Sequence, residues 1–132
     1  MITFSLPYPP SVNQYWRKRK GQQKNYISEA GKKFRADVLA IAFTQRIKKS
    51  TGLVAVTLVP YPPDLRERDG DNLWKAVLDG LVSAGVIPGD SNRVIRREVL
   101  EWGPKVKGGR LDVIIEPYRP RLEQIQKSFT NN

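Results

Sequence analysis

Residues 53–84, LVAVTLVPYPPDLRERDGDNLWKAVLDGLVSA, contain the strand and the helix that decide the fold. The first eight residues, 53–60, are rich in β-branched side chains and carry no charge, which predicts a buried strand. After a charged segment, we expect a helix from Asp71 or Asn72 to about Ala84, because apolar residues recur there at steps of three and four. This pair of elements indicates a domain that packs helices against a sheet.

On the N-terminal side, the sequence predicts one strand and one long helix. Apolar and polar residues alternate at 2–7, which indicates a strand, and the prolines after it break regular structure. Residues 11–27 are expected to form a long, mostly irregular connection. Ser28 has the side chain of an N-cap, and apolar residues then repeat at helical spacing to about Lys48, which predicts an amphipathic helix.

On the C-terminal side, two further strands are predicted at 93–102 and 110–116, joined by a hairpin-like loop rich in glycine. The tail, 117–132, is expected either to form a short helix at 121–127 or to fray. The predicted order is therefore β-α-β-α-β-β. It indicates one α+β domain over residues 1–116, with a mixed sheet of about four strands and two main helices.

The composition excludes several classes of protein. The chain contains no Cys and no His, which excludes disulfides, thiolate nucleophiles, imidazole metal sites and the Ser-His-Asp triad. Catalysis must therefore depend on carboxylates, Lys, Tyr, Ser or a metal held by oxygen. No apolar run approaches the roughly 20 residues that span a bilayer, and the N-terminus does not have the pattern of a signal peptide. We expect a cytoplasmic protein without a membrane partner.

The net charge indicates a polyanionic partner. Lys and Arg number 23 and Asp and Glu 13, so the net charge is +10. A small domain as basic as this most often binds nucleic acid. An anionic membrane surface is the alternative, but the chain has no strongly amphipathic basic helix with a wide aromatic face.

Acidic residues surround the start of the second predicted helix. Asp69 and Asp71 are two residues apart, so an extended backbone projects both carboxylates to one side. Clustered carboxylates repel unless a cation or a proton joins them, and hard oxygen ligands suit Mg²⁺ or Mn²⁺. Lys75 lies one turn after Asp71 on the same face. Asp90 follows the helix, and it approaches the other two acids only if the next strand runs back beside the preceding one.

The same acids also have ordinary structural interpretations. Asp71 could cap the helix, Asp69 with the next glycine could form a turn, and Asp90 could be a turn aspartate. Arg66 and Arg68 change the balance, because arginines beside two acids in a chain of charge +10 are typical of phosphate-binding residues around a metal site.

Basic loops provide further candidate contacts to nucleic acid. Glycines at 108–109 would let the backbone approach a phosphate, and the neighbouring cations would neutralise it. A second basic run, 17–20, has aromatic residues on either side that could stack on exposed bases. Either segment could instead be a solvated loop. The candidates from charge are Arg17, Lys18, Arg19, Arg66, Arg68, Lys105, Lys107 and Arg110.

The chain carries a series of short motifs in one order. They are Leu6-Pro7-Tyr8-Pro9-Pro10-Ser11 with Asn13, Arg68-Asp69-Gly70-Asp71-Asn72-Leu73 with Lys75, Gly85, Asp90, and Lys107-Gly108-Gly109-Arg110-Leu111. This series resembles the RusA-type Holliday junction resolvases over about residues 3–116. Each motif alone is weak, but the string from Asp69 to Lys75, followed by an Asp at this spacing, is specific.

The resemblance implies a homodimeric endonuclease that depends on Mg²⁺, with Mn²⁺ as a possible substitute. Its implied substrate is four-way junction DNA, cut by paired symmetric hydrolysis in recombination and repair. By match, the acidic catalytic and metal-binding residues are Asp69, Asp71 and Asp90, and the catalytic lysine is Lys75. The resemblance adds two candidate contacts to nucleic acid, Asn13 and Asn72. The family often has a second acid before the last Asp, and Gly89 occupies that position here.

One alternative is a non-catalytic basic protein that binds DNA or RNA. It would use the same cations but would need no metal. The acids distinguish the two hypotheses, because a protein that only binds a polyanion has no reason to place Asp69, Asp71 and Asp90 within a basic surface.

Overall fold

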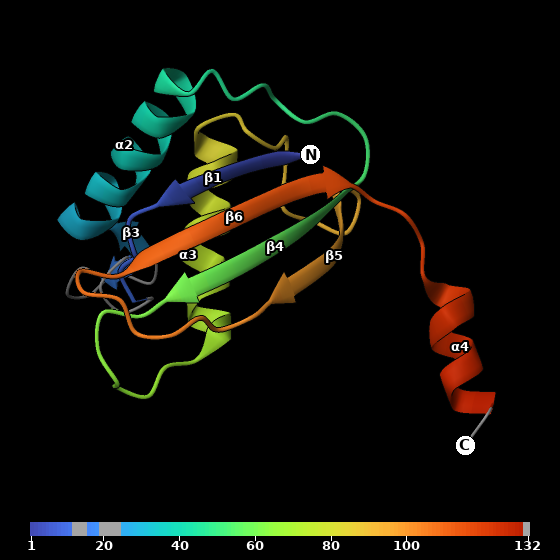
Figure 1. Ribbon diagram of the computed structural model, residues 1–132. Coiled ribbons are helices and arrows are strands. Elements are labelled where there is room, and N and C mark those ends of the chain that lie inside the picture. The colour runs from blue at the N-terminus through green and yellow to red at the C-terminus, as the bar shows by residue number, and fades with distance from the viewer. Residues whose placement is uncertain (12–15, 19–24, 131–132) are drawn as a thin grey trace.

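Four strands form a mixed sheet at the centre of the protein (Figure 1). The structure is a computed structural model that describes residues 1–11, 16–18 and 25–130. β6 pairs antiparallel with β1 and with β4, whereas β4 and β5 are parallel. The order across the sheet is β1-β6-β4-β5, and the strands are β1 (Ile2–Leu6), β4 (Val54–Tyr61), β5 (Ile95–Leu100) and β6 (Arg110–Pro117).

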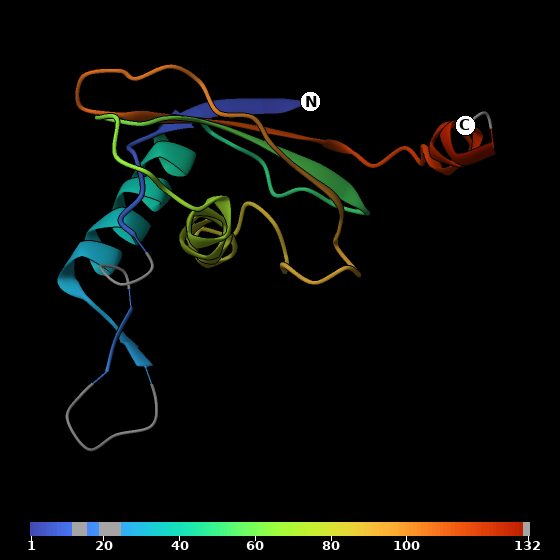
Figure 2. The same ribbon diagram turned by 90° about the horizontal axis from the view of Figure 1, so that it is seen from below.

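Two helices, α2 (Glu29–Thr44) and α3 (Gly70–Ser83), lie on the same face of the sheet (Figure 2). Alternate residues of the strands point into the layer between the sheet and the helices, where they exclude water together with apolar residues of both helices. The largest fully buried side chains in this core include Leu58, Leu81, Ile87, Leu111 and Ile115. The predicted α+β class, mixed sheet and two main helices are confirmed.

The connection predicted to be irregular contains a small antiparallel pair of strands. Its members are β2 (Trp16–Lys18) and β3 (Asn25–Ile27), in which Trp16 pairs with Ile27. The expectation of irregular structure was therefore wrong for these residues. Strands of three residues are too short to show the alternation by which strands are recognised in a sequence.

The C-terminal tail forms a third helix, α4 (Leu122–Thr130). All of its residues are exposed, and the helix projects away from the sheet (Figure 1). Of the two alternatives for the tail, the helix is thus the one observed. None of the helices in the described part of the chain combines the length and the apolar character needed to cross a membrane.

The connection between β5 and β6 is not a hairpin, contrary to the expectation. β4 lies between these two strands, so residues 101–109 must cross to the other side of β4. Backbone hydrogen bonds hold the start of this crossing against the end of β4, from Glu101 N–H to the Leu58 carbonyl and from Gly103 N–H to the Pro60 carbonyl. The glycines indicated a turn correctly, but local sequence carries no information about which strands pair.

The start of α2 is as predicted, and its end is not. The Oγ of Ser28 accepts a hydrogen bond from the Gly31 N–H at 3.1 Å, which confirms Ser28 as the N-cap. The helix ends at Thr44 rather than near Lys48, because Arg46 adopts a left-handed conformation with φ of 53°.

A half-buried ion pair joins α2 to α3. Arg35 donates from Nε and from one terminal nitrogen to the two carboxylate oxygens of Asp79, at 2.6 and 2.9 Å. An aspartate within a helix is most often a solvated surface charge. Instead the bidentate contact of Asp79 with a residue 44 positions away fixes one helix against the other.

We expect Asp79→Asn and Arg35→Met each to lower the free energy of unfolding by about 1–2 kcal/mol, because each leaves a half-buried partner without its counter-charge. Urea denaturation of both single variants and the double variant measures their coupling. The exposed pair Lys33–Asp37, 3.0 Å apart, is the control, and it should contribute less than about 0.5 kcal/mol. Additive losses at Arg35 and Asp79 would contradict this assignment.

Candidate functional site

The site begins where α3 meets the end of β5. Gly70, the first residue of α3, lies so close to the sheet that a Cβ there would be 3.2 Å from Cδ1 of Leu100. Asp69 precedes it as the N-cap in an extended conformation, and its side chain makes no capping hydrogen bond. The helix therefore does not use the Asp69 carboxylate, which is exposed and available to a ligand.

Asp69, Asp71, Asn72 and Lys75 are all exposed on the first turns of α3. Within the described part of the chain, neither Asp69 nor Asp71 accepts a hydrogen bond or joins an ion pair, and Lys75 has no carboxylate partner. Two carboxylates beside the positive end of the α3 dipole are favourably placed electrostatically. Lys75, one helical turn after Asp71, adds an exposed positive charge that can contact a phosphate group.

Asp90 lies at the other end of α3. The helix has 14 residues and therefore spans about 21 Å. Asp90 follows it in the loop before β5, where the Val54 N–H donates to the Val94 carbonyl and ties the loop to the start of β4. The next strand does run beside the preceding one, but it is parallel to it. Within one chain, the structure thus groups Asp69 with Asp71 and keeps Asp90 apart.

The donor set fits a hard divalent cation only in part. Asp69 and Asp71 offer unshared carboxylate oxygens of the kind that Mg²⁺ prefers. Among the described residues, however, no three acidic side chains come together in an arrangement that could hold a metal ion. The described part of one chain thus brings together two candidate metal ligands, Asp69 and Asp71, and the predicted three-aspartate set stays a prediction.

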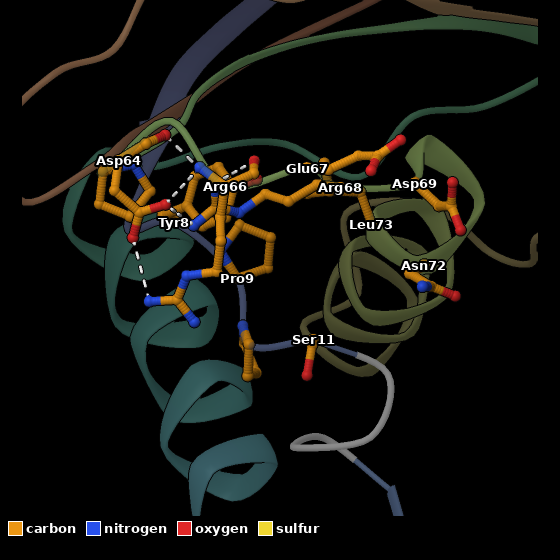
Figure 3. A pocket seen from close by; sticks show the side chains of 12 residues that line it. Tyr8, Pro9, Ser11, Asp64, Arg66, Glu67, Arg68, Asp69, Asn72 and Leu73 are labelled. Atoms are coloured by element: carbon orange, nitrogen blue, oxygen red, sulfur yellow. Dashed lines mark hydrogen bonds and ion pairs between the residues drawn. The ribbon is translucent and has the colours of Figure 1, made fainter.

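A cavity of about 630 Å³ lies beside these acids, and we call it the Tyr8 pocket. Figure 3 shows Tyr8, Asp64 and Arg66 on one side of it and Asp69 and Asn72 at the start of α3 on the other. The pocket is lined by Tyr8, Pro9, Pro10, Ser11, Pro63, Asp64, Arg66, Glu67, Arg68, Asp69, Asn72 and Leu73. Residues of the first proline-rich motif and of the acidic motif, far apart in sequence, thus form one hollow.

Asp64 holds the two arginines of the pocket. It accepts the Arg66 backbone N–H at 2.9 Å, and its carboxylate forms ion pairs with Arg66 at 3.2 Å and with Arg68 at 2.9 Å. The hydrogen bond from the Arg66 backbone, with the charges of both arginines, lowers the pKa of Asp64. Asp64 was not among the site residues predicted from the sequence, although its spacing of two and four from the arginines was a usable signal.

The aromatic ring of Tyr8 packs against the guanidinium group of Arg68. The guanidinium carbon of Arg68 lies 5.5 Å from the centre of the Tyr8 ring, a cation–π contact. Burial raises the pKa of the Tyr8 hydroxyl, so it remains protonated at neutral pH. This hydroxyl is buried and finds no hydrogen-bond partner among the described residues. A buried hydroxyl without a partner costs stability, which makes it a candidate contact to a ligand in the pocket.

The glycine-rich loop lies against the same pocket. The Val106 N–H donates to the Pro62 carbonyl at 2.9 Å, and a Cβ at Gly109 would be 2.7 Å from Cβ of Tyr8. Gly109 also has φ of 73°, so both its conformation and its close packing require glycine. Lys105 and Lys107 are exposed on this loop, which brings its predicted basic contacts to the end of the sheet where α3 begins.

Arg110 occupies the start of β6 at the base of this loop. Its Nε forms an ion pair with Asp112 at 3.1 Å, and its guanidinium lies 4.2 Å from the centre of the Tyr61 ring. The structure does not describe the side chains of the other four predicted contacts. Asn13 and Arg19 lie outside the described residues, and Arg17 and Lys18 are placed only as backbone of β2.

Comparison with known proteins identifies the class to which this fold and site belong. Residues 7–116 match the model of the family described as Endodeoxyribonuclease RusA. The match covers most of the 132 residues, and the chain therefore belongs to the RusA family. The family assignment expected from the motifs is confirmed. α4 lies beyond the matched residues.

Individual relatives support the same assignment. The crossover junction endodeoxyribonuclease rusA of Enterobacteria phage HK97 is 42% identical over 117 residues, which are 85% of this chain and 91% of the relative. The crossover junction endodeoxyribonuclease RusA of Escherichia coli strain K12 is 36% identical over 118 residues, 87% of this chain and 95% of the relative. The corresponding protein of Enterobacteria phage 82 is 37% identical over 112 residues, 84% of this chain and 90% of the relative.

We expect Tyr8→Phe to leave the free energy of unfolding unchanged or to raise it by up to about 1 kcal/mol, because it removes a buried hydroxyl that has no partner. If the hydroxyl contacts the ligand, the same variant should lose affinity for DNA while keeping its stability. Urea denaturation and DNA titration of the variant measure the two effects. A loss of stability above about 1 kcal/mol would mean that the hydroxyl is bonded within the protein.

Proposed function

We propose that this protein is a metal-dependent endodeoxyribonuclease that resolves four-way DNA junctions. Membership of the RusA family supports the nuclease activity, and the names of the relatives support the junction as substrate. The observation that carries the proposal is the pair of exposed carboxylates of Asp69 and Asp71, which have no partner among the described residues, beside a pocket lined by Arg66 and Arg68. Carboxylates within a basic surface oppose the binding of a polyanion unless a cation joins them, so this arrangement favours hydrolysis over simple binding.

Each group in the site then has a distinct task. Asp69 and Asp71, with Asp90, would hold Mg²⁺ or Mn²⁺, and the bound metal would supply Lewis-acid activation of water and of the phosphate. Arg66 remains largely exposed beside the pocket and can contact a phosphate oxygen. Lys75, exposed and without a carboxylate partner in the described part of the chain, can stabilise negative charge that develops on the scissile phosphate.

The position of Asp90 makes a second copy of the chain part of the proposal. About 21 Å of helix separates it from Asp69 and Asp71 in one chain. In a two-fold dimer with α3 at the interface, the Asp90 of each copy can approach Asp69 and Asp71 of the other. Such a dimer contains two equivalent sites, which matches the approximate two-fold symmetry of a four-way junction. We therefore propose a homodimer whose two active sites are shared between its subunits.

We expect the protein to nick a labelled synthetic four-way junction symmetrically in Mg²⁺, and to leave it intact in EDTA. A linear duplex of the same sequence is the matched control substrate and should remain uncut. Asp71→Asn should reduce cleavage at least about a hundredfold, because it removes charge from the metal site, and should still bind the junction. The control variant Asp37→Asn, on the exposed part of α2, should retain activity. Junction binding without cleavage by the unaltered protein would identify a non-catalytic binding protein.

Mixing two inactive variants tests whether the sites are shared. Asp71→Asn and Asp90→Asn should each be inactive alone, because each alters both sites of its own homodimer. After joint refolding, a heterodimer of the two has one site with every aspartate and one site that lacks two. We expect the mixture to nick a cruciform plasmid to the open-circular form without making it linear. An inactive mixture that contains heterodimers would mean that each site lies within one chain.

A further inference from the structure

The arginines of the described chain fall into two groups. One group is ion-paired and comprises Arg35, Arg66, Arg68 and Arg110. The other has no carboxylate partner among the described residues. Apart from Arg46 at the end of α2, its members lie in the turn before β5, on β5, and in the connection from β6 to α4, and they are Arg93, Arg96, Arg97, Arg119 and Arg121. Unpaired arginines thus gather at one end of the sheet.

Tyr118 organises the centre of this group. Its N–H donates to the Leu53 carbonyl at 2.9 Å, which fixes it beside the start of β4. The guanidinium groups of Arg96 and Arg97 lie 5.9 and 5.2 Å from the centre of its ring. Stacking on the ring uses the faces of these groups and leaves N–H donors at their edges for a partner.

Backbone carbonyls orient the same side chains. One terminal nitrogen of Arg97 donates to the Arg119 carbonyl at 2.7 Å, and one of Arg96 donates to the Asn92 carbonyl at 3.4 Å. These bonds consume one donor of each guanidinium and neutralise none of its charge. Arg96 and Arg97 are therefore held in place before any partner binds. Binding then costs less of the conformational entropy of these two side chains. We call Arg93, Arg96, Arg97 and Arg119 the arginine patch.

Acidic side chains near the arginine patch do not neutralise its positive charge. Glu116 lies in the same sheet, where Ala55 of β4 pairs with Arg97 on one side and with Glu116 on the other, so one strand separates them. Glu98 is the next residue of β5 and is exposed. Neither forms an ion pair with a described arginine. The patch thus retains its positive charge and is available to an external anion.

We propose that the arginine patch binds the phosphate backbone of a duplex arm of the DNA substrate. Preorganised guanidinium forks suit the phosphodiester oxygens, which they can engage bidentately. The patch is at the opposite end of α3 from Asp69, and its members Arg93, Arg96 and Arg97 follow Asp90 within seven residues. In the shared-site dimer it lies next to the Asp69 and Asp71 of the second copy. Each subunit then holds the DNA arm that leaves the other subunit's active site.

This proposal rests on the proposed function, and its test separates the two. We would titrate labelled four-way junction and linear duplex in EDTA, where no cleavage occurs, at several salt concentrations. Arg96→Gln/Arg97→Gln should make the slope of log affinity against log salt shallower by about 1.8, since each neutralised phosphate contributes about 0.9. The loss should be similar for junction and duplex, because backbone contacts do not distinguish them. Arg46→Gln, which removes an unpaired arginine outside the patch, is the control and should leave the slope unchanged.

The outcomes are distinct. A shallower slope in the double variant, with unaltered slope in Arg46→Gln, supports the patch as a DNA contact. An unchanged slope in the double variant overturns the proposal and leaves the patch to an acidic protein partner. Failure of the unaltered protein to cleave in Mg²⁺ would reject the nuclease function, and the EDTA titration would still decide the role of the patch. Circular dichroism and urea denaturation establish that the double variant is folded, and Arg93→Gln provides a second variant on the same surface.

Discussion

The parallel pairing of β4 with β5 is the constraint on which the rest of the structure depends. Parallel neighbours in a sheet require a crossover, and α3 provides it. The helix must return the chain from the end of β4 to the start of β5, so its two ends lie at opposite ends of the sheet. Every residue at the start of α3 is thereby separated from every residue that follows its end.

This separation divides the chemistry of the chain into two surfaces. At one end of the sheet, the start of α3 presents Asp69 and Asp71 beside the Tyr8 pocket, with the glycine-rich loop packed against Tyr8 and Pro63. At the other end, Asp90 lies close in sequence to the arginine patch. One surface thus holds two of the three predicted metal-binding aspartates, and the other holds the third. In a dimer with two antiparallel copies of α3 at its interface, the surface with Asp90 of each copy would lie beside the surface with Asp69 and Asp71 of the other copy.

Charge pairing assigns different roles to arginines that look alike in the sequence. Arg35 is bound to Asp79 and holds two helices together, whereas Arg68 is bound to Asp64 and stacks on Tyr8 to form a wall of the pocket. Arg96 and Arg97 are oriented by an aromatic ring and by carbonyls, which leave their charge intact. The cationic side chains are therefore not equivalent, because Arg35 and Arg68 are paired with carboxylates, whereas Arg96 and Arg97 form no ion pair among the described residues and lie together at Tyr118.

The sequence by itself determined the α+β class, the start of α2 at Ser28, the position of α3 and the aspartates around it. These features depend on periodicity, capping and short motifs, all of which act within a few residues. Only the tertiary structure decided that Asp90 lies away from Asp69, that Asp79 contacts Arg35, and that Tyr118 gathers arginines from β5. Those relations join residues about 20 to 44 positions apart, and their geometry follows from strand pairing, which leaves no local signal.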